Sequence, residues 1–403
     1  MALTVGFGLG AWLLLHVTLG LPLPGGSWLP LVQAHGHAQL VGFAGILVMG
    51  IGYRILPRFR STDDPSSRLV LLSYVAVVAG LVARVVAQPL LDIPPRSLLL
   101  FLSGPLELGG GLVYAAVALR TLSLGSNPHR ADEVLLAAAA AWFPIGLMWS
   151  FVALVPAMAG SALADGAAGD AATVALLLGF AGGHVIGVSC RVAPAFIAAR
   201  PASTRTILLA GAAWNLGVFG LVAGYAPAAW VALASAIALT WAIGPFRRGV
   251  GVAPLSAGAG ATRLAFRSAY AWLVVGLAML ALSALRGASF AEVSAARHAL
   301  ALGFLTLMVF GVGARLVPAL SGGVGLPVPA LRWAILLVNA AVALRVAIEA
   351  TAGYGTGPVA AALGVAALLA YAGLVSFAAA AARSVRSSVR SFIPVPSSSR
   401  TTM

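Results

Sequence analysis

Long apolar segments recur along almost the entire chain, and short stretches that carry most of its charged residues separate them. An α-helix needs about 20 apolar residues to cross the hydrocarbon core of a bilayer, so each segment predicts one transmembrane helix. Twelve such helices are predicted: residues 5–22, 34–57, 69–91, 98–120, 133–157, 172–198, 204–225, 227–245, 268–285, 295–320, 329–351 and 358–382.

The composition agrees with this pattern, since 61% of the 403 residues are hydrophobic and only 8% are charged. The mean hydropathy is +1.02. Soluble domains of this length do not have such a composition, and the fold class is therefore an all-α polytopic membrane protein. Residues 1–385 are predicted to form a single transmembrane domain. The Ser-, Pro- and Arg-rich residues 386–403 are predicted to form a disordered cytoplasmic tail.

The distribution of charge favours a membrane protein over a nucleic-acid-binding one. All 24 basic residues are arginines, dispersed over short loops, and most fall on one side of the twelve-helix arrangement. By the positive-inside rule that side is cytoplasmic, which predicts a cytoplasmic-membrane protein with both termini inside and with the bilayer, not a nucleic acid, as partner. Arg54, Arg191 and Arg315, near inner helix ends, are expected to reach toward lipid phosphates.

A motif that begins with a histidine occurs near both ends of the chain. His37 and His298 are each followed, at the same spacing, by Gly-Phe, Arg and Pro. A third copy keeps these residues but has Val174 at the histidine position and His184 further on. The helices at 34–57, 172–198 and 295–320 therefore head three units of four helices. Because four is even, the units share one orientation, which predicts a parallel repeat.

Histidines at one depth on two helices are suited to hold an iron porphyrin between two axial ligands. His37 and His298 both lie near the outer ends of their helices and are the predicted ligands of haem b. The single Cys190 leaves no motif for covalent attachment, so the haem would be non-covalent. The alternative is that each histidine only hydrogen-bonds in a helix interface. Because ionisable groups are costly to bury in a membrane, a repeated pair favours ligation.

Small and cationic residues complete the predicted haem site. Gly42, Gly45 and Gly303 follow the two histidines and allow a flat macrocycle or a neighbouring helix to approach. Arg84 and Arg345 stand at matched positions and are candidate partners of the haem propionates. An i,i+4 ion pair with Glu349 is the competing interpretation for Arg345.

Four further residues are candidates for metal binding or catalysis. His35 and His16 reach the same outer level as the predicted haem ligands, where they are candidate metal ligands. His35 would face a second cofactor or the outer interface. His184 and Glu107 lie within helices and are the candidate catalytic residues, His184 as a metal ligand and Glu107 as a carrier of protons or as the counter-charge of an arginine.

Three segments resemble signature motifs of the NnrS family and, more distantly, subunit I of the haem–copper oxidases. Residues 35–43 (His-Gly-His-Ala-Gln-Leu-Val-Gly-Phe) are similar to the family's His-Ala-His-Glu-Met-Leu-Phe-Gly-Phe. Residues 189–196 are similar to its Gly-Gly-Arg-x-x-Pro-x-Phe with both glycines replaced, and residues 298–303 match its His-Ala-Leu-x-x-Gly. The family's later Gly-His-Thr-Gly-Arg has no counterpart in residues 319–323.

The resemblance implies a haem-binding membrane protein, with copper as a further candidate cofactor, linked to tolerance of nitric oxide. In the oxidases, helices 2 and 10 carry the low-spin haem ligands, the places that His37 and His298 match. Helix 6 begins the copper site, where His184 stands. The adjacent copper-binding histidines of helix 7 are absent from residues 204–225, so a complete oxygen- or nitric-oxide-reducing centre is not expected.

The expected function is therefore that of an NnrS-type haem protein acting in nitric oxide or nitrosative stress. Its expected partners are nitric oxide or another diatomic gas and a quinol or a redox subunit. The first alternative is a reduced oxidase-like or nitric-oxide-reductase-like enzyme acting on NO or O₂. The second is a transporter that uses the repeat as a substrate pathway.

Overall fold

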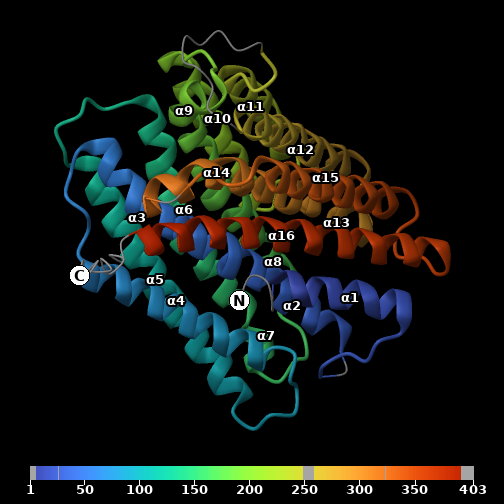
Figure 1. The fold of residues 1–403 in the computed structure, drawn as a ribbon. Coiled ribbons are helices and arrows are strands. Elements are labelled where there is room, and N and C mark those ends of the chain that lie inside the picture. Colours follow the sequence, from blue (N-terminus) through green and yellow to red (C-terminus); the bar gives the residue numbers. More distant parts are fainter. Residues whose placement is uncertain (1–5, 26, 248–257, 323, 392–403) are drawn as a thin grey trace, which may run out of the picture.

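The computed structural model describes residues 6–25, 27–247, 258–322 and 324–391, with side chains to residue 386. All regular structure in these ranges is helical. The helices lie side by side in one bundle, with α3 to α6 (blue to green) on one flank and α12 to α16 (yellow to red) on another (Figure 1).

Ten of the described helices are long and apolar enough to cross a membrane, which confirms the polytopic class. Two shorter apolar helices, α1 (Phe7–Leu19) and α11 (Ala228–Ile243), occupy the remaining two predicted segments. The ten comprise three composite rods, α2–η2–α3 (Trp28–Arg60), α8–η3–α9 (Gly166–Ile197) and α13–η4–α14 (Phe290–Ser321), and seven single helices, α4 (Ser67–Ala87), α5 (Arg96–Ser123), α6 (Ala131–Ala153), α10 (Thr204–Val222), α12 (Ala259–Arg286), α15 (Val328–Thr351) and α16 (Pro358–Ser391).

The outer surface of the bundle is strongly apolar. Leu71, Leu216, Trp241 and Leu285 each leave more than 60% of their surface exposed. Soluble monomers rarely expose apolar side chains over so much of their surface, because water makes such exposure unfavourable. Lipid chains carry no such penalty, and the exposed faces therefore suit a bilayer.

Each rod changes from α-helix to π-helix at the position of the repeated motif. The π-helices η2 (Ala38–Gly45), η3 (Ala175–Gly182) and η4 (Ala299–Thr306) each have eight residues and begin directly after His37, Val174 and His298. A π-helix is rare and wider than an α-helix, and it is frequent at functional sites. It also rotates the residues after it relative to those before it, which hydropathy does not reveal.

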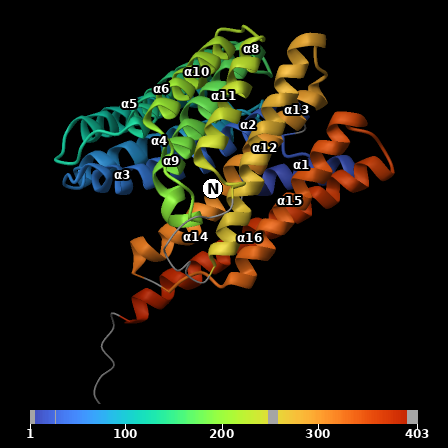
Figure 2. The same ribbon diagram turned by 90° about the horizontal axis from the view of Figure 1, so that it is seen from above.

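The three rods meet at the centre of the bundle. The π-helix η3 contacts both η2 and η4, and the other helices surround them. The short helix α1 contacts both α2 and α16, and α15 and α16 lie together on one flank of the bundle (Figure 2). The residues just before the π-helices therefore lie where helices of different units come together.

One packing contact occurs both where the first unit meets the second and where the second meets the third. Trp142 Nε1 donates to Asn215 Oδ1 at 2.9 Å, and Trp272 Nε1 donates to Asn339 Oδ1 at 3.0 Å. Each indole ring lies against a π-helix glycine, Gly179 for Trp142 and Gly303 for Trp272. The two junctions thus pack alike at this level, while the full three-unit repeat stays a prediction.

The C-terminal helix is longer than the apolar pattern indicates. Hydropathy ends the last segment at residue 382, whereas α16 continues to Ser391. It therefore includes the first residues of the predicted tail, because Arg and Ser permit a helix outside the apolar layer. Residues 392–403 lie outside the described part of the chain, and disorder there stays a prediction.

Candidate functional site

Both ring nitrogens of His37 are engaged in a buried cluster of side chains. Nε2 lies 2.8 Å from Oε1 of Glu107 on α5, and Nδ1 lies 3.2 Å from Oγ of Ser150 on α6. All three residues are buried. A carboxylate only accepts hydrogen bonds, so Nε2 carries the hydrogen, as assigned from these partners. His37 is thus held in the tautomer whose Nε2 cannot bind a metal.

Arg84 on α4 supplies the positive charge of this cluster. Nη1 donates to Ser150 Oγ at 2.6 Å and Nε donates to Gln88 Oε1 at 3.1 Å. Gln88 in turn donates to Gln33 Oε1 at 3.0 Å. We refer to Gln33, His37, Arg84, Gln88, Glu107 and Ser150 as the His37 cluster. The charges of Arg84 and Glu107 offset one another through Ser150 and His37, so the cluster is electrically balanced.

His298 on α13 heads a second cluster with the same charge types. Its Nδ1 lies 2.7 Å from the carbonyl oxygen of Ser294 and 3.7 Å from Glu349 Oε2. Arg345 Nε donates to Glu349 Oε1 at 3.0 Å, which confirms the predicted i,i+4 pair on α15. Tyr354, between α15 and α16, donates to the same oxygen at 2.8 Å. We refer to these five residues as the His298 cluster.

Tyr354 is held in its protonated form. Burial and the nearby Glu349 carboxylate raise the pKa of Tyr354 above its ordinary value. The neutral phenol can therefore donate to Glu349 while its oxygen lies 2.9 Å from the hydroxyl of Ser294. This contact ties the loop after α15 to α13.

The His298 cluster, unlike the His37 cluster, leaves a buried oxygen without a hydrogen-bond partner among the described residues. Glu349 is 1% exposed, yet its Oε2 accepts no hydrogen bond from any residue that the structure describes. Nε2 of His298 also makes no hydrogen bond to any other described residue, because the ring's contacts are made through Nδ1. A buried acceptor without a donor costs free energy, and such groups are uncommon unless they serve a ligand.

His35 lies on the opposite side of α2 from His37 and resembles His298 in its bonding. Its Nδ1 lies 2.9 Å from the carbonyl oxygen of Gly6, and its ring rests against Gly10 of α1. A carbonyl oxygen accepts, so Nδ1 carries the hydrogen and Nε2 keeps its lone pair. His35 also lies within electrostatic range of His298 and Arg345. The structure thus associates His35, not His37, with the His298 cluster.

His184 and His16 lie apart from both clusters. His184 Nδ1 is 2.9 Å from the carbonyl oxygen of Phe180, and Nε2 is 2.9 Å from the hydroxyl of Tyr114. His16 bonds through Nδ1 to the carbonyl oxygen of Leu21. Within the described ranges, no three His, Cys, Asp or Glu residues come together in a way that could hold a metal ion. Copper binding therefore stays a prediction, with no ligand set around His184.

The three glycines of the predicted haem site face neighbouring helices. A Cβ at Gly42 would lie 2.8 Å from Leu81, and one at Gly303 would lie 2.5 Å from Trp272. A Cβ at Gly45 would lie 3.5 Å from Phe143. Of the two roles expected for these glycines, close helix packing is the one that the contacts display.

A buried ion-pair network at the other end of the bundle was not predicted from the sequence. Arg191 donates to Asp132 and Glu133 of α6, at 2.8 Å each, and its side chain is only 15% exposed. The expectation that Arg191 reaches toward lipid phosphates is therefore wrong. Arg60 lies 3.5 Å from Glu133 and is also buried. Asp132 and Glu133, two adjacent acids at the start of an apolar helix, were the feature of the sequence that could have predicted this network.

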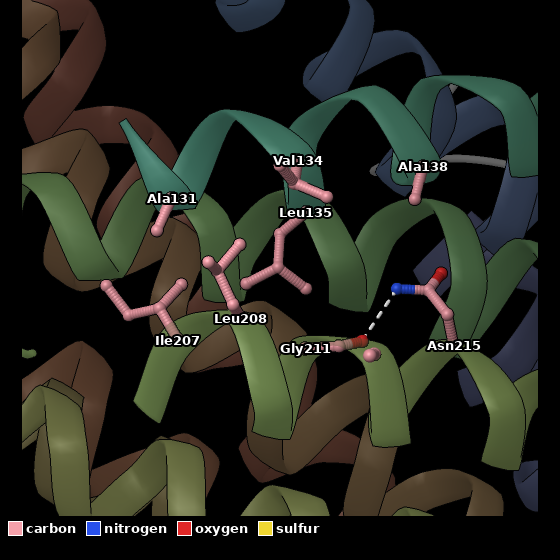
Figure 3. Close-up of a pocket in the computed structure, with 9 residues that line it drawn as sticks. Ala131, Val134, Leu135, Ala138, Ile207, Leu208, Gly211 and Asn215 are labelled. Atoms are coloured by element: carbon pink, nitrogen blue, oxygen red, sulfur yellow. Dashed lines mark hydrogen bonds between the residues drawn. The ribbon is translucent and has the colours of Figure 1, made fainter. Parts of the chain in front are cut away.

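A shallow groove between α6 and α10 lies away from the histidine clusters. It has a volume of about 230 Å³ and is lined by Ala131, Val134, Leu135, Ala138, Ile207, Leu208, Gly211, Ala212 and Asn215 (Figure 3). The Asn215 amide already bonds to Trp142 and to Gly211. The groove therefore offers no polar group to a ligand, and its lining suits an acyl chain.

The whole transmembrane part of the chain matches one protein family. No curated protein is found to be similar to the chain. The family model described as NnrS protein matches residues 1–386, a range that contains both histidine clusters and His184. The match thus extends far beyond the three motifs that carry the resemblance. The chain belongs to the NnrS family.

Proposed function

We propose that this protein is a haem-binding, multi-pass protein of the cytoplasmic membrane that acts in the response to nitric oxide or nitrosative stress. The observation that carries the proposal is the buried Glu349 oxygen of the His298 cluster that has no hydrogen-bond partner in the described part of the chain. In the same region, His298 and His35 each bond through Nδ1 to a backbone carbonyl oxygen, and their Nε2 atoms make no hydrogen bond to a described residue. Both termini are proposed to lie in the cytoplasm, as the arginine distribution favours.

The bonding of these histidines suits axial ligation of haem. A histidine that donates Nδ1–H to a carbonyl group presents Nε2 as a fixed neutral donor to a metal. His298 and His35 have this arrangement, whereas His37 would first have to release Glu107. The residues present therefore fit a haem held by His298 and His35. The pairing of His298 with His37 stays an untested prediction that the hydrogen bonds do not favour.

The two arginine candidates for the propionates differ in how many of their N–H groups are already bonded. Arg84 bonds through Nη1 and Nε within the His37 cluster. Among the described residues Arg345 bonds only through Nε, to Glu349, and its charge acts on His35. Its remaining N–H groups can donate to a propionate, since a guanidinium has five donors. We therefore assign the propionate role to Arg345.

When bound, haem would supply an iron that passes one electron, or that takes up nitric oxide in exchange for one of its two histidines. The chain's own residues orient and shield it. The carbonyl groups of Gly6 and Ser294 hold the imidazole planes, and Tyr354 covers the acid of the cluster from the loop side. Electrons would come from a quinol or a partner subunit. Copper has no part in this proposal.

The optical spectrum of the purified, haem-supplied protein, reduced minus oxidised, tests the proposal. Wild type is expected to show a b-type spectrum that His298→Ala and His35→Ala abolish. His37→Ala and His16→Ala are the matched controls and are expected to retain it. If the spectrum is lost in His37→Ala and retained in His35→Ala, the ligands are His37 and His298, as predicted from the sequence. The absence of a haem spectrum from wild type would refute the haem proposal.

The stress role needs a separate test in cells. A strain without the protein is expected to grow more slowly than its parent when a nitric oxide donor is added. The wild-type chain should restore growth, and His298→Ala at equal abundance should not. Equal growth of all strains would refute the role while leaving the haem site untouched.

A further inference from the structure

A ladder of three tyrosines runs through the first unit and ends at His184. The rings of Tyr74 on α4 and Tyr53 on α3 have centroids 6.3 Å apart, and those of Tyr53 and Tyr114 on α5 are 5.2 Å apart. The His184 imidazole on α9 follows at 5.9 Å from Tyr114. Neither the haem proposal nor the two polar clusters uses these residues.

The first two hydroxyls of the ladder donate to oxygen atoms. Tyr74 donates to the carbonyl oxygen of Ile46 at 3.1 Å. Tyr53 lies 2.8 Å from Ser73 Oγ, whose own hydrogen goes to the carbonyl oxygen of Val70. Carbonyl and hydroxyl oxygens accept a hydrogen bond but are far too weak as bases to take up a proton.

The third hydroxyl donates to a base. His184 Nδ1–H donates to the carbonyl oxygen of Phe180 at 2.9 Å, so Nε2 carries the lone pair. Tyr114 O–H points at that lone pair from 2.9 Å. The pair is shielded from solvent, with Tyr114 at 0% and His184 at 3% exposure. Of the three tyrosines, Tyr114 is thus the one whose hydroxyl proton can be transferred to a base.

The backbone of α3 is shaped around two of these hydroxyls. A Cβ at Gly52 would lie 2.5 Å from the Tyr114 oxygen. A Cβ at Gly50 would likewise clash with the Tyr74 oxygen. Any side chain at Gly52 would therefore push the phenol away from His184.

We propose that Tyr114 and His184 form a redox-active pair that donates one electron to a small radical oxidant. The choice of nitrogen dioxide, which forms when nitric oxide meets oxygen, rests on the proposed function. Tyr114 loses one electron and its O–H bond breaks. The proton forms an N–H bond at His184 Nε2. Nitrogen dioxide gains the electron and leaves as nitrite, and the products are a neutral tyrosyl radical hydrogen-bonded to an imidazolium.

The ladder separates the oxidant from the buried pair. Tyr74 is only partly buried, whereas Tyr53 and Tyr114 are buried, so an oxidant in the lipid meets Tyr74 first. An electron moves outward along the rings, and the hole settles at Tyr114. Oxidation makes a phenol a strong acid, and the hole is most stable where a base holds the released proton. This step does not require that haem is bound.

Electron paramagnetic resonance of the full-length protein tests the proposal. Nitrogen dioxide is generated by pulse radiolysis of nitrite in the detergent solution, and the sample is frozen at once. Wild type is expected to show a neutral tyrosyl radical, which Tyr114→Phe abolishes. Tyr225→Phe removes an exposed tyrosine between α10 and α11, and this matched control is expected to leave the radical unchanged.

A second variant keeps the test valid if Tyr114→Phe folds poorly. His184→Gln supplies a hydrogen-bond acceptor of similar reach that is not a base, and the radical is expected to be lost although Tyr114 remains. A radical of wild-type yield in Tyr114→Phe or in His184→Gln would overturn the proposal. The absence of a tyrosyl radical from oxidised wild type would overturn it too.

Discussion

Glu107→Gln isolates the charge balance of the His37 cluster. The substitution keeps an oxygen that accepts from His37 Nε2, so the hydrogen bond of 2.8 Å survives while the negative charge is lost. Arg84, only 6% exposed, then retains a positive charge among neutral partners. Removing one member of a buried pair typically costs about 3–5 kcal/mol of stability. Because Ser150 and His37 separate the two charges, we expect the lower end, about 3 kcal/mol.

Equilibrium unfolding in mixed detergent micelles, followed by tryptophan fluorescence, measures this cost. Asp170→Asn is the matched control, since it also removes one carboxylate that pairs with an arginine. The Asp170 side chain is 66% exposed, so its loss should change the unfolding free energy by only about 0.5 kcal/mol. The double variant Arg84→Met/Glu107→Gln removes both charges and should cost clearly less than the sum of its parts.

Two outcomes would refute this reasoning. One is a cost of Glu107→Gln no larger than that of Asp170→Asn. The other is strict additivity in the double variant, because coupled buried charges should show an interaction free energy of about 0.5–3 kcal/mol. The haem spectrum is a further check, since we place Glu107 outside the haem site and expect Glu107→Gln to retain it.

Three further predictions concern packing, ion pairing and pH. Gly303→Ala should lower the stability measured by calorimetry by about 1–3 kcal/mol, because the new Cβ would lie 2.5 Å from Trp272. The control Gly109→Ala, whose Cβ would meet no described atom within 4 Å, should be neutral or stabilising. Equal effects of the two substitutions would contradict the packing at Gly303. Arg191→Met removes the cation shared by two buried carboxylates and should lower the unfolding free energy by about 3 kcal/mol. A much smaller loss would show that Arg60 and Arg130 alone balance the two acids. Because the pKa of Tyr354 is raised on folding, its contribution to stability is present below pH of about 10 and declines at higher pH, and Tyr354→Phe should flatten that decline in alkaline unfolding curves.

The positions of the helices followed from the sequence because hydropathy is a local property. Each of the twelve predicted segments contains a described helix, and differences are confined to the ends. The first rod begins at Trp28 rather than at residue 34, because Gln33 and His35 lower the local hydropathy there. Both side chains find hydrogen-bond partners on other segments, which hydropathy cannot show.

Most of the hydrogen-bond partners within the two polar clusters could not be predicted from the sequence. Spacing along the chain singled out His37, His298, Arg84 and Arg345, and all four are buried or half-buried. Glu107, also buried, was singled out by its place within an apolar helix. Which side chain bonds to which depended on contacts between distant segments. Glu107 was predicted to carry protons or to balance the charge of an arginine, and the structure shows it as the hydrogen-bond partner of His37.

The sequence by itself determined that the chain is a membrane helix bundle and that histidines recur just before a shared Gly-Phe motif. Only the tertiary structure decided the direction in which each histidine points. His35 and His37 are two residues apart, about 200° around a helix, so one faces α1 and the other faces α5 and α6. Both have the same side chain and nearly the same depth, and what distinguishes them is the neighbouring helix that takes up their ring nitrogens.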